Sequence, residues 1–140
     1  MTNRAPEHLH LVRVYYEDTD AGGVVYYSNY LGFAERARAE LLRDSGIDQR
    51  TLLAKRGLMF AVRRCEAEYL KPGRLDDMLE VYSRCLEVKG ASFLLEQLVK
   101  CTGETLVEMK VRLVCMKVDG RPTRLPEKLR KSLDGLLHAR

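Results

Sequence analysis

One long helical pattern is followed by strand patterns almost to the end of the chain, and this order constrains the fold more than any other feature. From Ser28 the apolar residues recur with a period near 3.6, which is typical of an amphipathic helix, and the pattern ends at Gly46. The apolar side consists of Leu31, Phe33, Ala34, Ala37, Leu41 and Leu42. A single helix of this kind must bury its apolar side, and the strands must cover one of their own faces. The sequence therefore predicts a sheet that wraps around one helix.

Runs of β-branched and aromatic residues occupy most of the remaining chain and indicate strands. They lie at residues 9–17, 58–71, 78–88, 92–101 and 105–118. The short turn signals Lys89-Gly90 and Thr102-Gly103 predict that the last three strands form antiparallel hairpins. A short helix is expected from Asp48 to Lys55, and a surface helix from Pro126. We therefore predict an α+β fold in which a five-stranded antiparallel sheet wraps around a long central helix.

Length and composition indicate one domain, residues 1–140. The chain has 46% apolar residues, which is enough for one core. No window approaches the length of apolar sequence that spans a membrane, and the first ten residues lack the apolar run of a signal peptide. We expect a soluble, cytoplasmic protein. The net charge of +4 is interspersed along the chain, which hints at an anionic ligand but is too mild to indicate nucleic-acid binding.

The four cysteines lie in strand-like apolar stretches and form no C-x-x-C pair. They are Cys65, Cys85, Cys101 and Cys115. This pattern favours reduced thiols in the core over a disulfide or zinc framework.

The last strand has apolar residues on both faces in places, as where Leu113 is followed by Val114 and Met116. We therefore expect the outer face of the sheet to be covered as well, and a homo-oligomer is the natural way to cover it.

The stretch EDTDAGGVVYYSNY, Glu17 to Tyr30, places a carboxylate and two glycines directly before the long helix. Gly22 and Gly23 would let the backbone approach a ligand closely. The first turn of a helix has N–H groups without intrahelical partners, and these can stabilise an oxyanion. Asp20 could attack a carbonyl carbon or activate a water molecule that does so. The stretch therefore supplies two parts of an acyl-transfer site.

Two other interpretations of this stretch remain open on the residues alone. Aspartate and glycine are common turn formers, so the segment is also compatible with an ordinary loop. A metal site formed by Glu17, Asp18 and Asp20 is disfavoured, because no EF-hand spacing follows and no histidine lies nearby. We predict no metal and no cofactor.

The segment RVYYEDTDAGGVVYYSNYLGFAERARAELLR, Arg13 to Arg43, closely resembles the signature of hotdog-fold acyl-CoA thioesterases. The resemblance is to the branch that contains 4-hydroxybenzoyl-CoA thioesterase and the Tol-Pal-associated YbgC-type enzymes. KPGRLDDMLEVYSR (Lys71 to Arg84) and ASFLLEQLV (Ala91 to Val99) are also similar to family segments, so the match covers nearly the whole chain. The resemblance implies the hotdog fold, a dimer with sites at the subunit interface, and often a tetramer.

Residue by residue, the resemblance implies that Asp20 is the catalytic aspartate, acting as nucleophile or general base. It implies that the backbone N–H of Tyr27 binds the thioester carbonyl. Asp18 does not match the catalytic role, and we expect it to be a loop or capping carboxylate. The YbgC-type branch commonly has histidine at the position of Tyr27, whereas the 4-hydroxybenzoyl-CoA branch has tyrosine there. This departure leaves the substrate branch open.

Further residues have both a functional and a purely structural interpretation. Phe60 and Ala61, with Val62, match a region that lines the acyl pocket in the family, although core packing explains them equally well. Lys89 and Ser92 flank a turn that lies near the CoA arm in the family, although an exposed turn lysine is common. Candidates for contacts with CoA phosphates are Arg63, Arg64, Lys71, Arg74 and Arg121.

Glu35 lies on the helix where other hotdog enzymes place a carboxylate, but its charged neighbours indicate a solvated face. His8, His10 and His138 are near the termini, which favours surface roles and argues against the histidine-based hydratase chemistry of hotdog relatives.

The leading hypothesis is an acyl-CoA thioesterase that releases CoA and a carboxylic acid. The alternative is a non-catalytic subunit that binds acyl-CoA or an acyl-carrier protein, with a link to the cell envelope.

Overall fold

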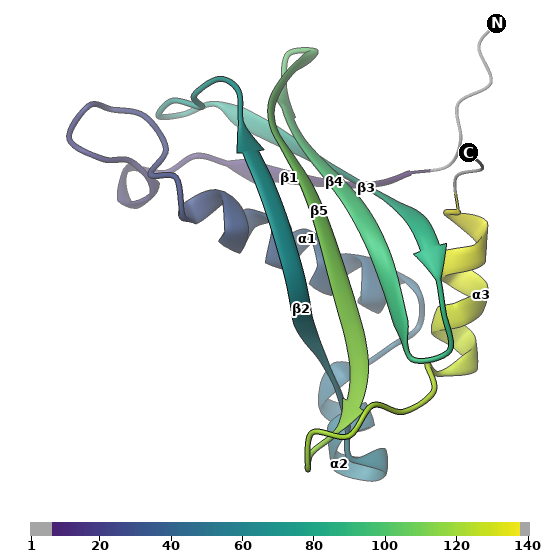
Figure 1. Cartoon of the computed structure of the whole chain (residues 1–140). Coiled ribbons are helices and arrows are strands. Elements are labelled where there is room, and N and C mark those ends of the chain that lie inside the picture. The colour runs from purple at the N-terminus through teal and green to yellow at the C-terminus, as the bar shows by residue number, and fades with distance from the viewer. Residues whose placement is uncertain (1–6, 138–140) are drawn as a thin grey trace, which may run out of the picture.

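The computed structural model describes residues 7–137 and shows one antiparallel sheet curled around a helix (Figure 1). The strands are β1 (His8–Arg13), β2 (Leu58–Tyr69), β3 (Met78–Val88), β4 (Ser92–Cys101) and β5 (Glu104–Lys117). The helices are α1 (Asn29–Asp44), α2 (Gln49–Arg56) and α3 (Glu127–Gly135). The predicted α+β hotdog architecture is confirmed.

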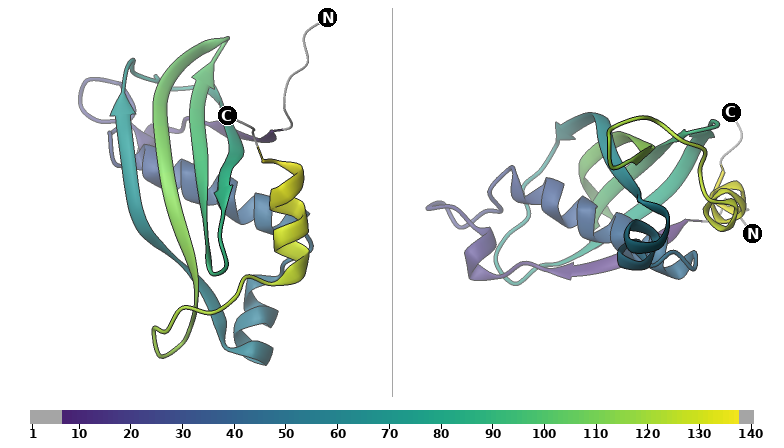
Figure 2. Two further views of the ribbon diagram at one scale, coloured as in Figure 1. Left: turned by 45° about the vertical axis from the view of Figure 1, so that its right-hand side comes forward. Right: turned by 90° about the horizontal axis from the view of Figure 1, so that it is seen from below.

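The sheet has the strand order β1-β3-β4-β5-β2, with neighbours antiparallel. The predicted hairpins are the β3–β4 and β4–β5 pairs. The chain between β1 and β2 contains α1 and α2, and it crosses from one edge of the sheet to the other. Figure 2 shows α1 inside the curve of the sheet, which is where its apolar side can be buried.

The first strand is shorter than the sequence predicts. It ends at Arg13, and Tyr16–Asp18 form a turn of 3₁₀ helix instead of continuing the strand to residue 17. The physical reason is local, because the Asp18 carboxylate accepts the N–H of Tyr15 at 2.9 Å and closes the turn.

The core lies between α1 and the inner faces of β1, β3 and β4. Phe33, Ala34, Ala37 and Leu41 of the helix are at most 2% exposed, as expected. Leu31 is 40% exposed, contrary to the prediction, because the buried stripe follows Tyr30, Phe33, Ala37 and Leu41, and Leu31 lies off this line. The helix therefore has the predicted period, but its buried side begins at Tyr30 and not at Leu31.

A buried polar side chain fixes the helix on the sheet. Gln97 of β4 is fully buried, and its Nε2 donates to the carbonyl of Ala34 at 3.1 Å and to Ser83 Oγ at 3.0 Å. Its Oε1 accepts from Arg38 Nη1 at 3.0 Å. Because each polar atom of this amide has a partner, the network specifies one position of α1 rather than a sliding apolar contact.

Helix α3 covers the end of the core beside β3 (Figure 2). Leu129 and Leu133 are fully buried, and the N–H of Cys85 donates to the carbonyl of Leu136 at 3.0 Å.

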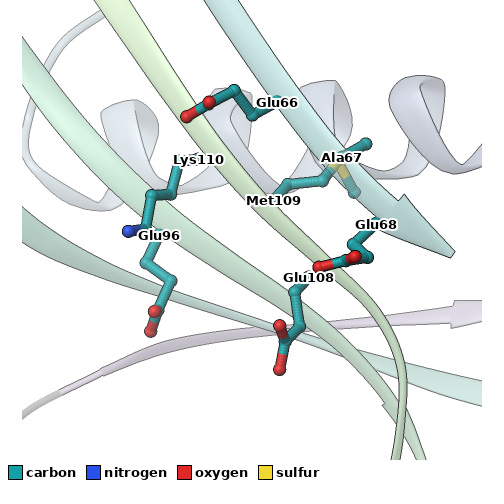
Figure 3. Close-up of a pocket in the computed structure, with 7 residues that line it drawn as sticks. All are labelled: Glu66, Ala67, Glu68, Glu96, Glu108, Met109 and Lys110. Carbon is teal, nitrogen blue, oxygen red and sulfur yellow. The ribbon is translucent and has the colours of Figure 1, made fainter. Parts of the chain in front are cut away.

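The outer face of the sheet is charged over β4, β5 and β2, which the sequence did not predict. Figure 3 shows acidic side chains from three neighbouring strands around Lys110. They are Glu66 and Glu68 of β2, Glu96 of β4 and Glu108 of β5. Alternation in β5 turns Met109 and Val111 inward and Glu108 and Lys110 outward. The predicted outer apolar surface is limited to partly buried positions such as Val114 and Met116.

Strand β2 is an open edge. Its residues 62–69 are all exposed, since α1 lies mainly under β1, β3 and β4 and no strand within residues 7–137 pairs with the other side of β2. Cys65 is therefore exposed, contrary to the prediction of a core thiol, while Cys85 and Cys115 are buried and Cys101 is partly buried. All four thiols are free. Within residues 7–137, none of the helices has the length and apolar character needed to cross a membrane.

Candidate active site

Asp20 lies at the tip of a tight loop between β1 and α1. Its N–H donates to the carbonyl of Val24 at 2.9 Å, and its own carbonyl accepts the N–H of Gly23 at 3.0 Å. Gly23 has a φ of 78°, in the left-handed region that favours glycine, so the loop needs glycine at this position. These two hydrogen bonds therefore fix the backbone of Asp20, while the residue itself is exposed.

The carboxylate of Asp20 is held on one side only. Oδ1 accepts the N–H of Gly22 at 2.8 Å, while Oδ2 has no hydrogen-bond partner among residues 7–137. A β-carbon on Gly22 would lie 3.3 Å from Oδ1, so glycine gives this carboxylate the room it occupies. One oxygen of Asp20 is thus oriented and the other is available for chemistry.

The loop is anchored to the segment that follows β2. The N–H of Val25 donates to the carbonyl of Gly73 at 2.9 Å, and the buried N–H of Gly73 donates to Tyr30 Oη at 2.8 Å. A β-carbon on Gly73 would meet Val25 at 3.3 Å and Tyr30 Oη at 3.4 Å. Close backbone contact at Gly73 therefore joins the loop, the first turn of α1 and the β2–β3 connection.

The N–H of Tyr27 is available immediately before α1. The carbonyl of Tyr26, which belongs to the same peptide group, accepts the N–H of Asn29 at 2.8 Å. Because a trans peptide is planar, its N–H points away from that bond. Within the described residues no acceptor is found for the Tyr27 N–H, and the adjacent helix terminus adds a partial positive charge. This group can donate to an oxyanion.

A chain of aromatic rings runs from this loop into the core. The ring of Tyr27 lies 6.0 Å from that of Tyr69 at the end of β2, and Tyr69 lies 5.9 Å from Tyr30. Tyr30 in turn contacts Phe33, and Tyr26 contacts Tyr27. Burial raises the pKa of both the Tyr69 and Tyr30 phenols, so these rings remain neutral near pH 7.

The other predicted site residues lie at the opposite end of β2. Phe60 and Ala61 are partly buried near the start of the strand, and the ring of Phe60 lies 6.3 Å from that of Phe93. At about 3.3 Å per residue, they are on the order of 25–30 Å from the Tyr69 end. One chain therefore does not bring Phe60 and Ala61 to Asp20.

Lys89 and Ser92 border a surface cavity of about 370 Å³ together with Arg63, Arg64 and Arg112. Arg64 of β2 is directly opposite Arg112 of β5 in the sheet register. Two like charges at directly opposite positions destabilise a sheet. The Arg112 guanidinium donates a hydrogen bond to Glu87 and lowers the pKa of that carboxyl, and Arg64 Nη2 lies 3.4 Å from Glu66 Oε2. The cavity is a basic site suited to an anion.

The remaining candidates lie outside this cavity. Lys71 pairs with Glu104, and Arg121 pairs with Asp119 at 2.9 Å. Arg74 is exposed, and its backbone N–H donates to Asp77 Oδ2 at 2.9 Å. The cation that sequence reasoning missed is Arg112. The alternation of charged and apolar residues in β5 would have placed it on the outer face, whereas its position opposite Arg64 depends on the register between β2 and β5.

Other carboxylates and histidines have structural surroundings. Glu35 is exposed on α1, and its charge partly offsets the lowering of the pKa of Arg38 that burial causes. His8 Nε2 lies 2.8 Å from Asp44 Oδ2, while His10 borders a surface cavity near β1. His138 lies outside the described residues. Within residues 7–137 no group of three or more His, Cys, Asp or Glu side chains is arranged to hold a metal ion.

Comparisons with known proteins agree with this architecture. A family model described as the thioesterase-like superfamily matches residues 14–133. Acyl-CoA thioester hydrolase YbgC of Escherichia coli is 44% identical over 120 residues, which cover 84% of this chain and 89% of the relative. Acyl-CoA thioesterase YbgC of Haemophilus influenzae is 41% identical over 126 residues, covering 89% and 93% of the two chains.

A solved structure, a probable thioesterase from Bartonella henselae, superposes with a TM-score of 0.83 at 37% identity. The match covers 86% of this chain and all of that one. The fold and the sequence therefore define a hotdog enzyme of the thioester hydrolase class. The chain belongs to the thioesterase-like superfamily, and its relatives include the YbgC proteins.

Proposed function

We propose that this protein hydrolyses acyl-CoA thioesters, with Asp20 as nucleophile or general base and the Tyr27 N–H as the oxyanion donor. One observation carries the proposal. The same short loop contains the Asp20 carboxylate, of which only one oxygen is hydrogen-bonded, and the Tyr27 N–H, which has no acceptor among the described residues. The names of the two YbgC relatives support acyl-CoA as the substrate class.

Two routes are chemically consistent with this arrangement. As a base, Asp20 takes a proton from water, and the resulting hydroxide forms a bond to the thioester carbon. As a nucleophile, its carboxylate forms that bond itself, and water later cleaves the acyl-aspartate anhydride. In both routes the carbonyl oxygen becomes negative beside Tyr27, and collapse of the intermediate breaks the C–S bond and releases the CoA thiolate. Glycine residues at 22 and 23 leave room for the substrate beside Asp20.

We infer that the complete site is formed by two copies of the chain. Strand β2 pairs with β5 on one side only, and its residues 62–69 are exposed, so its free edge is a ready template for pairing with another chain. Antiparallel pairing of two β2 strands would place the Tyr69 end of one copy beside the Phe60 end of the other. Asp20 and Tyr27 of one subunit would then face the partner subunit's Phe60 and Ala61, which would line the acyl pocket. A dimer is the minimum, and a tetramer would be a pair of such dimers.

The basic cavity is the proposed site for CoA phosphates. The cations Arg63, Arg64, Lys89 and Arg112 border the cavity and outnumber the acidic partners Glu66 and Glu87, so a bound anion would add to the compensation of their charge. Ser92 borders the cavity and offers a hydroxyl. The same two-copy arrangement would bring this cavity toward the acyl site, so that one CoA molecule could bridge the two. We also infer a cytoplasmic location, which suits a chain with four free thiols.

Asp20→Asn tests the proposal. We expect the fold to be kept and kcat for CoA release to fall at least about 100-fold, the usual range for loss of a general base. The matched control is Glu17→Gln, which changes an exposed carboxylate in the same loop and should leave kcat unchanged. CoA release is measured with a thiol reagent over short-chain, long-chain and aromatic thioesters.

Three outcomes would contradict parts of the proposal. Near-wild-type hydrolysis by Asp20→Asn removes Asp20 from the chemistry. Binding of every thioester without CoA release favours the alternative of a subunit that binds acyl-CoA or an acyl-carrier protein. A monomeric mass by light scattering together with full activity excludes a site shared between two copies.

A further inference from the structure

Asp18 is buried in a loop whose other acidic residues are exposed. It is 6% exposed, whereas Glu17 and Asp20 on either side of it are open to solvent. A carboxylate is costly to bury unless its oxygens are hydrogen-bonded. The sequence identified Asp18 only as a loop or capping residue, so its burial requires an explanation.

Both carboxylate oxygens of Asp18 accept hydrogen bonds from N–H groups. Oδ2 accepts the backbone N–H of Tyr15 at 2.9 Å, and Oδ1 accepts Nδ2 of Asn29 at 3.0 Å. The backbone carbonyl of Asp18 accepts the N–H of Tyr26 at 2.9 Å. Asp18 therefore joins the end of β1, the far side of the loop and the first residue of α1.

These partners flank both groups of the proposed reaction. Asp20 follows Asp18 by two residues, while Tyr26 and Asn29 lie on either side of Tyr27. The carbonyl of Tyr26 is also the acceptor for the Asn29 N–H, and that bond directs the Tyr27 N–H. A shift of Tyr27 relative to Asp20 would therefore have to break bonds that converge on Asp18.

We propose that Asp18 is a positioning residue, whose buried carboxylate holds the Tyr27 N–H and the Asp20 carboxylate in a fixed relation through Tyr15, Tyr26 and Asn29. This inference rests on the proposed function, since it names a further residue of the same site. Asp18 itself does not touch the substrate. Fixed positioning matters because a misplacement of about 1 Å can reduce a rate by on the order of 100-fold.

Asparagine is not an adequate substitute at this position. Its amide has one acceptor oxygen, and its NH₂ group would face an N–H donor of Tyr15 or Asn29. At least one bond is therefore lost, and two donors are brought together. A residue needed only for turn formation would tolerate asparagine well, because asparagine is also a common turn former.

The test compares Asp18→Asn and Asn29→Ala with Glu17→Gln in the full-length protein. We expect kcat to fall at least about 10-fold in the first two variants, with KM changed less than about 2-fold, and both values unchanged in the third. The double variant Asp18→Asn/Asn29→Ala should be little worse than the poorer single variant, because the two side chains form one connection. If Asp18→Asn does not fold, Asn29→Ala still carries the test, since it leaves the carboxylate and the Tyr15 bond in place.

Amide hydrogen exchange gives a readout that does not depend on activity. The Tyr26 N–H should be protected in the wild-type chain and in Asp20→Asn, and should exchange faster in Asp18→Asn. The proposal would be overturned if Asp18→Asn folds, keeps kcat within 2-fold of wild type and leaves the exchange rate of the Tyr26 N–H unchanged. Failure of the proposed function looks different, because Asp20→Asn would then remain active while the exchange rates still respond to Asp18.

Discussion

The hydroxyl of Tyr30 provides a clean test of how the site is anchored. Its oxygen accepts the buried N–H of Gly73 at 2.8 Å, and the carbonyl of Gly73 accepts the N–H of Val25 in the loop that carries Asp20. Tyr30→Phe removes one oxygen atom and keeps the ring, which packs against Tyr69 and Phe33. The change therefore isolates a single hydrogen bond.

The expected cost follows from what is left behind. The Gly73 N–H remains buried without an acceptor, and an unsatisfied buried donor costs about 1–3 kcal/mol. For 140 residues, an entropy of unfolding of about 2.1 cal/mol/K per residue gives about 0.3 kcal/mol/K. The melting temperature should therefore fall by about 3–10 °C.

Differential scanning calorimetry and urea unfolding measure this change, with Tyr16→Phe as the control. Tyr16 is 82% exposed, so removal of its hydroxyl should leave the melting temperature within about 1 °C of wild type. If Tyr30→Phe is as stable as this control, the bond to Gly73 does not anchor the loop that carries Asp20, and the reasoning is refuted.

Two further predictions concern pH and ligand binding. Burial raises the pKa of the Cys85 thiol from 9.0 to about 11, so the folded chain keeps a proton that the unfolded chain loses between these values. The free energy of unfolding should therefore fall by up to about 3 kcal/mol as pH rises from about 9 to 11, and Cys85→Ala should make this slope in urea unfolding shallower. Arg64→Ala should raise KM for an acyl-CoA about 10-fold at constant kcat, because a phosphate contact far from the reacting carbon stabilises ground and transition states equally. Lys71 pairs with Glu104 outside the basic cavity, so Lys71→Ala should leave KM unchanged. Equal KM values for the two variants would refute the proposal that the basic cavity binds the CoA phosphates.

The elements of the fold could be predicted because their signals are local. The helix over 29–44 follows from a 3.6-residue period, and the strands follow from β-branched runs between turn residues. The strand boundary at Arg13 could not be predicted, because the Asp18 carboxylate competes with the strand for the Tyr15 N–H. Exposure of Cys65 also had no local signal, since it depends on which strand lies at the edge.

The candidate site divides in the same way. Asp20, the paired glycines and the helix start are close in sequence, so the sequence alone displays their motif. Phe60 and Ala61 lie near the start of β2, whereas the loop that carries Asp20 contacts the Tyr69 end of that strand through Tyr27. A single chain therefore does not bring them together. The resemblance to hotdog thioesterases named all these residues, while the distance along the strand is the reason for proposing a site made from two copies.

The sequence by itself determined the periodicities, the turns and the loop that presents Asp20, because each depends on residues within a few positions of one another. The tertiary structure decided the strand order, the open edge at β2, the partner of each buried polar group and the convergence of Arg64 with Arg112. These features depend on contacts between residues far apart in the chain. Asp18 lies between the two cases, because its partners Tyr15, Tyr26 and Asn29 are near it in the sequence, yet only the folded loop reveals that this common turn residue accepts hydrogen bonds from all three.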